Sequence, residues 1–136
     1  MRILPECTKE TSVTQIKCEE NKRKILFLNP NRKLVRKIKV DGCQITDGLK
    51  CDFLVKFNDT ENFVELKGSD ISHAFKQLSR TISLLGDNSC QKRYSFVISS
   101  RCPLTSTEIQ NERLKFKKKY KSELFVKNNN HKIEIN

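Results

Sequence analysis

The stretch CDFLVKFNDTENFVELKGSDISHAFKQLSRTISLL, residues 51–85, carries the elements around which we expect the chain to fold. Asp52 opens a short apolar run of β-favouring residues, and a second apolar run ends at Glu65 and Lys67. The polar residues 58–62 between the two runs are few enough for the runs to pair as an antiparallel hairpin. Pairing of this kind predicts that Asp52 and Glu65 lie close together.

The residues at the end of the second run have the composition of a metal site. Side chains alternate along a strand, so Glu65 and Lys67 are expected on one face and Leu66 on the other. The carboxylates of Asp52 and Glu65, with the Leu66 backbone carbonyl between them, are hard oxygen ligands suited to Mg²⁺ or Mn²⁺. A cation there would activate water, and Lys67 would orient that water or stabilise a phosphodiester transition state. The pattern therefore predicts metal-dependent phosphodiester hydrolysis.

An amphipathic helix is predicted to follow Lys67 directly. Ser69 or Asp70 can cap its start, and one face collects the apolar residues of the segment. His73 and Gln77 are four residues apart and share a flank of this helix. We interpret His73 as a partly exposed residue that supports packing, because the sequence identifies no partner for it. The residues expected to be buried are Ile71, Ala74, Phe75, Leu78, Ile82 and Leu85.

Asp52, a spacer and Glu65-Leu66-Lys67 resemble the PD-(D/E)xK motif of restriction-endonuclease-like nucleases, over roughly the middle half of the chain. Cys51 stands where that family has a proline. The resemblance implies an α/β fold, a restriction-endonuclease-like mixed β-sheet flanked by helices. It also implies that Asp52, Glu65 and the Leu66 carbonyl hold Mg²⁺ or Mn²⁺ and that Lys67 assists catalysis. Gln77 on the following helix would border the site.

A further ligand is suggested near the N-terminus. Residues 8–21 favour a helix on which Val13, Ile16 and Glu20 share one side. In the family that the motif resembles, an acid on the first helix often completes the metal site. Glu20 is therefore the fourth candidate ligand, with Glu19 behind it. The alternative interpretation of Glu20 is a surface glutamate at a fraying helix end.

The remaining elements follow from turn and capping signals. Strands are expected at residues 25–28 and 33–40 with a turn between them, and at 94–99, parallel to the strand that ends at Lys67. Asp41-Gly42 and Asp47-Gly48 read as turns. Thr105 and Glu108 have the spacing of a capping box for a helix that runs to about Lys121. Residues 124–127 and 132–135 are expected to close the fold as a hairpin.

The charge of the chain favours a polyanionic partner. Lys and Arg number 27 against 16 Asp and Glu, a formal net charge of +11. DNA is the expected partner by family resemblance, ahead of RNA. The alternative is that the basic side chains on each face are only solvated by water and contact no phosphate. The candidate phosphate-contacting residues lie on the strand at 33–40 and on the last helix: Arg36, Lys37, Lys39, Arg113, Lys115, Lys118 and Lys119.

The length of 136 residues predicts a single domain, 1–136, without a separate recognition module. Such a protein would act on structured DNA or ends, or as a homodimer that cuts both strands. The six cysteines and two histidines lack zinc-ligand spacing, and most of the cysteines are expected to be reduced residues of the core. No apolar run suits a membrane span or a signal peptide, so we expect a cytoplasmic protein without a membrane partner.

Two other functions fit the sequence less well. The first is a non-catalytic nucleic-acid-binding or scaffolding subunit with the same fold, and the second is a basic ribosome-associated protein without a site. The intact set Asp52, Glu65 and Lys67 favours the enzyme, because burying three ionisable groups together costs stability unless a metal or partner compensates.

Overall fold

Strands β5 (Phe53–Phe57) and β6 (Thr60–Lys67) form the antiparallel hairpin that the sequence predicts. The computed structural model, which describes residues 1–135, closes it with Asn58 and Asp59 alone. Both residues have positive φ, the conformation of the tightest hairpin turns. Residues 60–62, predicted as part of the link, belong to β6 instead. The strand is buried from Thr60 to Leu66, which makes it the centre of the molecule.

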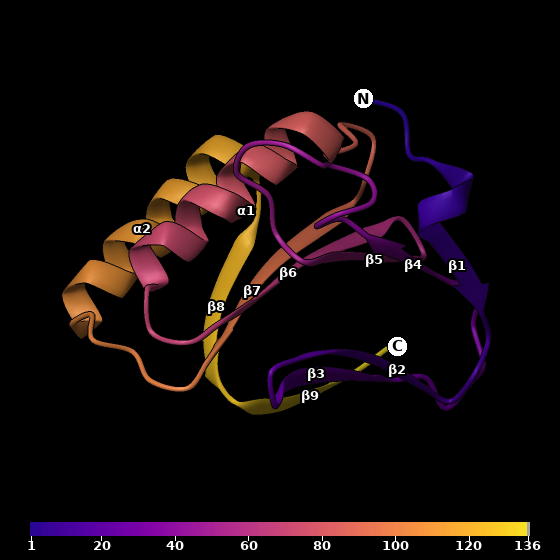
Figure 1. The fold of residues 1–136 in the computed structure, drawn as a ribbon, viewed down its shortest axis with the longest axis horizontal. Helices are drawn as coiled ribbons and strands as arrows, with labels where there is room; N and C mark the ends of the chain where they lie inside the picture. The colour runs from indigo at the N-terminus through magenta and orange to yellow at the C-terminus, as the bar shows by residue number, and fades with distance from the viewer. Residues whose placement is uncertain (136) are drawn as a thin grey trace.

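The elements around this hairpin form three layers (Figure 1). The middle layer is a six-stranded mixed sheet in the order β1-β4-β5-β6-β7-β8, and the outer sheet has the order β2-β3-β9. Helices α1 and α2 cover the other face of the large sheet. The strands added to β5 and β6 are β1 (Thr8–Thr11), β2 (Gln15–Glu20), β3 (Arg23–Leu28), β4 (Val35–Lys39), β7 (Lys92–Ser99), β8 (Glu123–Asn128) and β9 (Asn130–Glu134).

Both long helices begin where the capping signals predict. Helix α1 (Ile71–Leu85) is capped by Asp70, whose Oδ1 accepts the His73 backbone N–H at 3.1 Å. The six apolar residues predicted to be buried on α1 are all buried. Helix α2 (Ser106–Tyr120) starts with the complete Thr105–Glu108 capping box and buries Phe116. Between the helices, β7 returns parallel to β6, as expected.

The alternation of side chains along β6 divides the core in two. Phe63 packs in the cluster between the large sheet and the helices, with Leu78 of α1 and Phe116 of α2. Val64 and Leu66 pack in the cluster between the two sheets. Each face of β6 is therefore covered by a different layer, which explains why nearly every residue of the strand is buried. Glu65 and Lys67 lie on the helix side by the same alternation.

The helix predicted over residues 8–21 is wrong, because this segment forms β1 and β2. Ile16 and Cys18 are buried while Gln15 and Lys17 are exposed, which is the two-residue period of a strand. Val13, which the helical interpretation placed on the apolar side, is 49% exposed. Consequently a sheet, and not a helix, covers the second face of the large sheet. The α/β class that the sequence predicts is confirmed.

The hairpin predicted over residues 124–135 is wrong, and the strands predicted on either side of the turn after Leu28 belong to different sheets. Strand β3 pairs with β2 and β9, whereas β4 pairs with β1 and β5, so the turn after Leu28 carries the chain from one sheet to the other. Likewise β8 pairs with β7 and β9 pairs in parallel with β3. Strands that are neighbours in the sequence were expected to be neighbours in space. Instead β3 and β9 belong to the outer sheet, while β4 and β8 belong to the large sheet.

The cysteines differ from the prediction. Cys7, in the short 3-10 helix η1 (Pro5–Cys7), forms a disulfide with Cys43, and of the other four only Cys18 and Cys51 are buried. The prediction that most are reduced core residues is therefore wrong. Disulfides persist mainly in oxidising compartments, so this one is at odds with the expected cytoplasmic location. Over residues 1–135, neither helix has the length and apolarity needed to cross a membrane.

A buried ion pair links β6 to β7 and to the ends of both helices. Glu61 is fully buried, and its Oε1 accepts from Arg93 Nε at 2.9 Å. Arg93 also donates to the backbone carbonyls of Asp87 and Tyr120. Removing Arg93 would leave the buried Glu61 carboxylate with one cation, Lys56, whose Nζ lies 3.8 Å from Oε2, and so with weaker compensation.

We therefore predict that Arg93→Met lowers the free energy of unfolding by about 3–5 kcal/mol, measured by urea denaturation. The double variant Glu61→Gln/Arg93→Met should recover part of this loss, because no buried charge is left uncompensated. Equal losses in the single and double variants would contradict this account of the pair.

Candidate active site

Asp52 lies immediately before β5, at the point where β5 and β6 separate. Its side chain is 7% exposed, and Oδ2 accepts the Leu66 backbone N–H at 2.8 Å. In a continuing sheet the Leu66 N–H would donate to a backbone carbonyl of the neighbouring strand, and here the Asp52 carboxylate accepts it instead. The N–H and C=O of one residue in an antiparallel strand project toward the same edge, so the Leu66 carbonyl also faces the Asp52 side.

Glu65 occupies the helix side of β6 next to this position. It is only 3% exposed, and its Oε2 lies 4.0 Å from Lys67 Nζ. Its other oxygen, Oε1, is buried and has no hydrogen-bond partner among residues 1–135. A buried polar atom without a partner costs on the order of 1–3 kcal/mol, and more for a charged group. Glu65 is thus arranged for an interaction that the protein itself does not supply.

Both carboxyl groups hold their protons more strongly than free carboxyl groups do, chiefly because they are buried. Burial raises the pKa of Asp52 from 3.8 to about 7, against the opposing effect of the Leu66 hydrogen bond. Burial also raises the pKa of Glu65 from 4.5 to about 9, and the Asp52 charge raises it further, while Lys67 lowers it. A cation between the two carboxylates would offset both effects. Without one, the charged forms are disfavoured at neutral pH.

Lys67 is held in place by Gln77. Lys67 Nζ donates to Gln77 Oε1 at 3.0 Å, and Gln77 Nε2 donates to the Lys50 carbonyl at 3.0 Å. Gln77 therefore connects the end of β6 to the loop that precedes Asp52. Lys67 is partly exposed, so its ammonium group can reach solvent as well as Glu65. His73, on the same flank of α1, is partly buried.

Glu20 lies near this centre although it comes from a strand and not from a helix. It is the last residue of β2, and its charge and a side-chain hydrogen bond both raise the pKa of Asp52. The neighbouring Glu19 instead forms an ion pair with Lys17 at 3.5 Å. Asp41, interpreted from the sequence as a turn residue, also contributes its charge to the pKa of Asp52 and of Glu65.

Three side chains at helical spacing on α1 hold the loop that leads to Asp52. Besides Gln77, Arg80 donates through one guanidinium nitrogen to the carbonyls of Asp47 and Leu49, both at 2.8 Å. Thr81 Oγ1 accepts the Cys51 N–H at 2.8 Å. Sequence reasoning missed Arg80 and Thr81. They follow Gln77 by three and four residues, which places all three side chains on one flank of the helix. This spacing is the sequence feature from which their position beside Gln77 could have been predicted.

Asp52 and Glu65 are the residues suited to hold a metal. In residues 1–135, no three His, Cys, Asp or Glu side chains are gathered closely enough to enclose an ion by themselves. Mg²⁺, however, is commonly held by one or two carboxylates and retains several waters. The unpartnered Glu65 Oε1, the adjacent Asp52 carboxylate and the Leu66 carbonyl edge fit such a site, and Glu20 lies near enough to influence it electrostatically.

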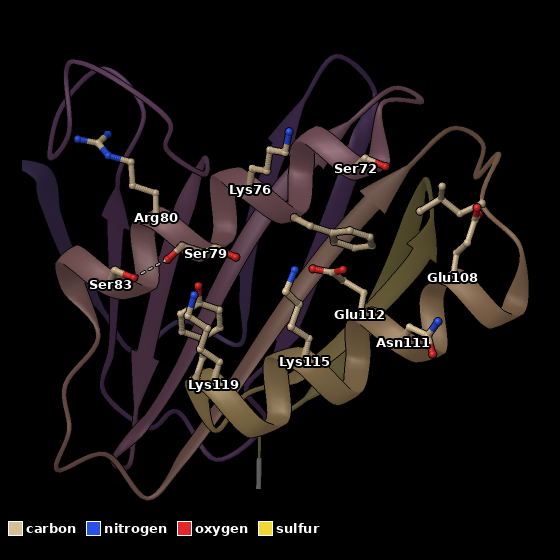
Figure 2. Close-up of a pocket in the computed structure, with 13 residues that line it drawn as sticks. Ser72, Lys76, Ser79, Arg80, Ser83, Glu108, Asn111, Glu112, Lys115 and Lys119 are labelled. Carbon is tan, nitrogen blue, oxygen red and sulfur yellow. Dashed lines mark hydrogen bonds between the residues drawn. The ribbon is translucent and has the colours of Figure 1, made fainter.

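The predicted phosphate-contacting residues fall into two groups. On β4, Arg36 forms an ion pair with Glu10 at 3.1 Å, and Lys37 donates to the Lys17 carbonyl, whereas Lys39 is exposed. On α2, Arg113, Lys115, Lys118 and Lys119 are all exposed. A groove of about 730 Å³ lies between α1 and α2 and is lined by residues that include Lys115 and Lys119 (Figure 2). Asp52 and Glu65 do not line this groove.

Comparisons with protein-family models, curated proteins and solved structures find no match for this chain. Its function is therefore argued from the site alone.

The raised pKa values predict how stability depends on pH when no metal is present. The folded protein retains protons that the unfolded chain has released, on Asp52 between pKa values of 3.8 and about 7 and on Glu65 between pKa values of 4.5 and about 9. Unfolding then becomes easier as the pH rises through these intervals. We expect the thermal midpoint in EDTA to fall over that range, and the double variant Asp52→Asn/Glu65→Gln to show a flatter profile. Parallel profiles for the two proteins would disprove the assignment.

The loop before Asp52 gives a second prediction, with a matched control. Gly42 and Gly48 both have positive φ, but only at Gly48 would an added Cβ collide with a side chain, the Arg80 guanidinium. Gly42→Ala should therefore cost only backbone strain, about 1–2 kcal/mol. Gly48→Ala should cost more, because it also displaces Arg80 from the loop. Urea denaturation of the two variants measures the difference, and equal losses would show that the Arg80 contact contributes nothing.

Proposed function

We propose that the protein is a divalent-metal-dependent nuclease that hydrolyses phosphodiester bonds of DNA. The observation that carries this proposal is Glu65 Oε1, which is buried beside Asp52 and has no hydrogen-bond partner within residues 1–135. Two carboxylates brought together at this depth would be a liability in a purely structural protein. They are explained if a cation and a phosphate substrate complete the site.

The similarity to the centre of PD-(D/E)xK nucleases includes the order of the elements as well as the spacing of Asp52, Glu65 and Lys67. The motif acids lie at the open end of an antiparallel hairpin, a helix follows at once, and a parallel strand returns beside Lys67. Gln77 on that helix contacts the motif lysine directly. These features support a restriction-endonuclease-like core, to which the outer sheet of β2, β3 and β9 is an addition.

The departure from the motif has a structural counterpart. Cys51 stands at the proline position of the family, and its N–H donates to Thr81 Oγ1. A proline has no N–H and could not make this hydrogen bond. The backbone of Cys51, the residue before Asp52, is therefore hydrogen-bonded to α1. A proline at this position could not form that bond.

The catalytic roles follow from the geometry. A bound Mg²⁺ or Mn²⁺ would supply Lewis acidity and lower the pKa of a water. Asp52, Glu65 and the Leu66 carbonyl would hold that ion, with Glu20 nearby. Lys67 would orient the water for attack on phosphorus or stabilise the charge that develops on the phosphoryl oxygens as the bond to the leaving oxygen breaks. Gln77 fixes the Lys67 ammonium for this task and is a positioning residue.

The small size of the chain bears on the substrate. With no recognition module in residues 1–135, we propose action on DNA structure or ends, or cleavage of both strands by a homodimer. Light scattering at working concentration tests the dimer, and a mass of one chain would exclude it.

The proposed activity is tested by incubating the purified protein with supercoiled DNA, circular single-stranded DNA, a four-way junction and RNA. We expect cleavage of DNA with Mg²⁺ or Mn²⁺ and none in EDTA. Glu65→Gln should abolish cleavage, and Lys67→Met should slow it by roughly 10²–10³-fold, as expected when a stabilising donor is removed.

Surface variants provide the matched controls. Glu134→Gln and Lys132→Gln make the same changes of charge at exposed positions of β9 and should cleave as the wild type does. If the wild type binds DNA as tightly as Glu65→Gln and neither cuts any substrate, the nuclease proposal fails. The non-catalytic nucleic-acid-binding subunit would then be the better account.

A further inference from the structure

Three connected hollows run along the helical side of the molecule. The first is the groove of about 730 Å³ between α1 and α2, and the second, about 510 Å³, lies past the end of α1. The third, about 460 Å³, lies at the starts of β7 and β8. Ser83 and Lys119 line both the first and the second, and Lys92 and Lys121 line both the second and the third. The three therefore form one path, here called the α2 track.

The α2 track is lined by cations that the protein leaves available. Arg93 also borders it but is committed to Glu61. None of the lysines along the path forms an ion pair within the part of the chain that the structure describes. The acids along it are fewer: Asp87, Glu108, Glu112 and Glu123. Arg80 is likewise committed, to the Asp47 and Leu49 carbonyls. The cations left available along the α2 track are Lys76, Lys92, Lys115, Lys117, Lys119 and Lys121.

Neutral groups along the first hollow suit a phosphate backbone as well. Figure 2 shows Lys115 and Lys119 extending from α2 toward α1, where Ser79 and Ser83 line the facing wall. Hydroxyl and amide side chains, together with Lys and Arg, make most protein contacts to nucleic-acid phosphates. Tyr120 also lines this hollow, with its ring packed edge-on against Phe116 and Lys119 Nζ 5.5 Å from the ring centre.

The shape of the α2 track favours a single strand over a duplex. The path bends. Lys115 and Lys117 are about 200° apart around α2, so the first and third hollows lie on opposite flanks of the helix. A duplex with a persistence length of about 150 bp cannot follow such a turn, whereas a single strand can.

The α2 track and the candidate active site share helix α1. Lys76 lines its first hollow and is the neighbour in sequence of Gln77, which holds Lys67. We propose that the α2 track binds a single strand of DNA that enters or leaves the catalytic centre. This inference rests on the proposed nuclease function for its biological meaning. It narrows the substrate to single-stranded DNA or to duplexes that carry a single-stranded branch.

The proposal is tested by binding in EDTA, where no cleavage occurs. The probes are a fluorescein-labelled oligothymidylate of about 30 nucleotides and a duplex of equal length. In a salt series, each phosphate contact to a single strand contributes about 0.7 to the slope of log affinity against log salt. Lys115→Gln/Lys119→Gln/Lys121→Gln should lower that slope by about 2 and weaken binding about a hundredfold at about 0.1 M salt.

A second variant tests the bend separately. Lys92→Gln/Lys117→Gln removes cations from the third hollow and should lower the slope by about 1.4. If only the first variant weakens binding, the strand does not pass around α2 and the α2 track is disproved as a continuous path. The control, Lys9→Gln/Lys33→Gln/Lys132→Gln, removes three charges elsewhere and should leave the slope close to that of the wild type.

The outcomes separate this inference from the nuclease proposal. Glu65→Gln should bind the oligothymidylate as the wild type does, whether or not the wild type cuts DNA. If the wild type cuts no DNA but the track variants still bind the oligothymidylate more weakly than the wild type, only the nuclease proposal is overturned. The α2 track is overturned if the duplex binds as tightly as the single strand, or if the track variants and the control lose affinity equally while all remain folded by circular dichroism.

Discussion

The burial of two carboxyl groups side by side, Asp52 and Glu65, is the constraint on which the organisation of this protein depends. Both are nearly excluded from solvent, and one oxygen of Glu65 has no partner in the described chain. Their raised pKa values express the cost of placing them there. A chain that retains such an arrangement must offset that cost through its surroundings or through a ligand. We interpret the missing partner as a divalent cation.

Helix α1 positions the two carboxyl groups through two of its faces, one apolar and one polar. Its apolar face covers the large sheet, and this packing fixes the helix against β6. Its polar flank then reaches the loop before Asp52 through Gln77, Arg80 and Thr81. The site is thus positioned by a rigid element and not by the loop itself. Positioning of this kind matters because catalytic groups must be held within a fraction of an ångström of their productive geometry.

The electrostatics of the molecule are divided in space. At the end of the hairpin, Glu20 and Asp41 raise the pKa values of Asp52 and Glu65, and Asp52 raises that of Glu65. Along the α2 track, on the helical side, six lysines form no ion pair within residues 1–135, and further lysines of this kind, such as Lys9 and Lys132, lie on the two sheets. Basic residues of β4 are partly neutralised within the fold, as Arg36 is by Glu10. The overall charge of +11 attracts a polyanion to the molecule as a whole, and the hollows beside α2 are where the proposed DNA strand would be held.

What the sequence by itself determined is local: the β5–β6 hairpin, the caps of α1 and α2, the buried face of α1 and the shared face of Glu65 and Lys67. Each of these rests on a period or a capping signal within a few residues. Which sheet a strand joins, the disulfide from Cys7 to Cys43 and the approach of Glu20 to Asp52 were decided only by the tertiary structure. Residues 8–21 show the physical reason. Their apolar positions are too few to separate a helix from a strand, and only the pairing with β4 in the large sheet and with β3 in the outer sheet made them β1 and β2.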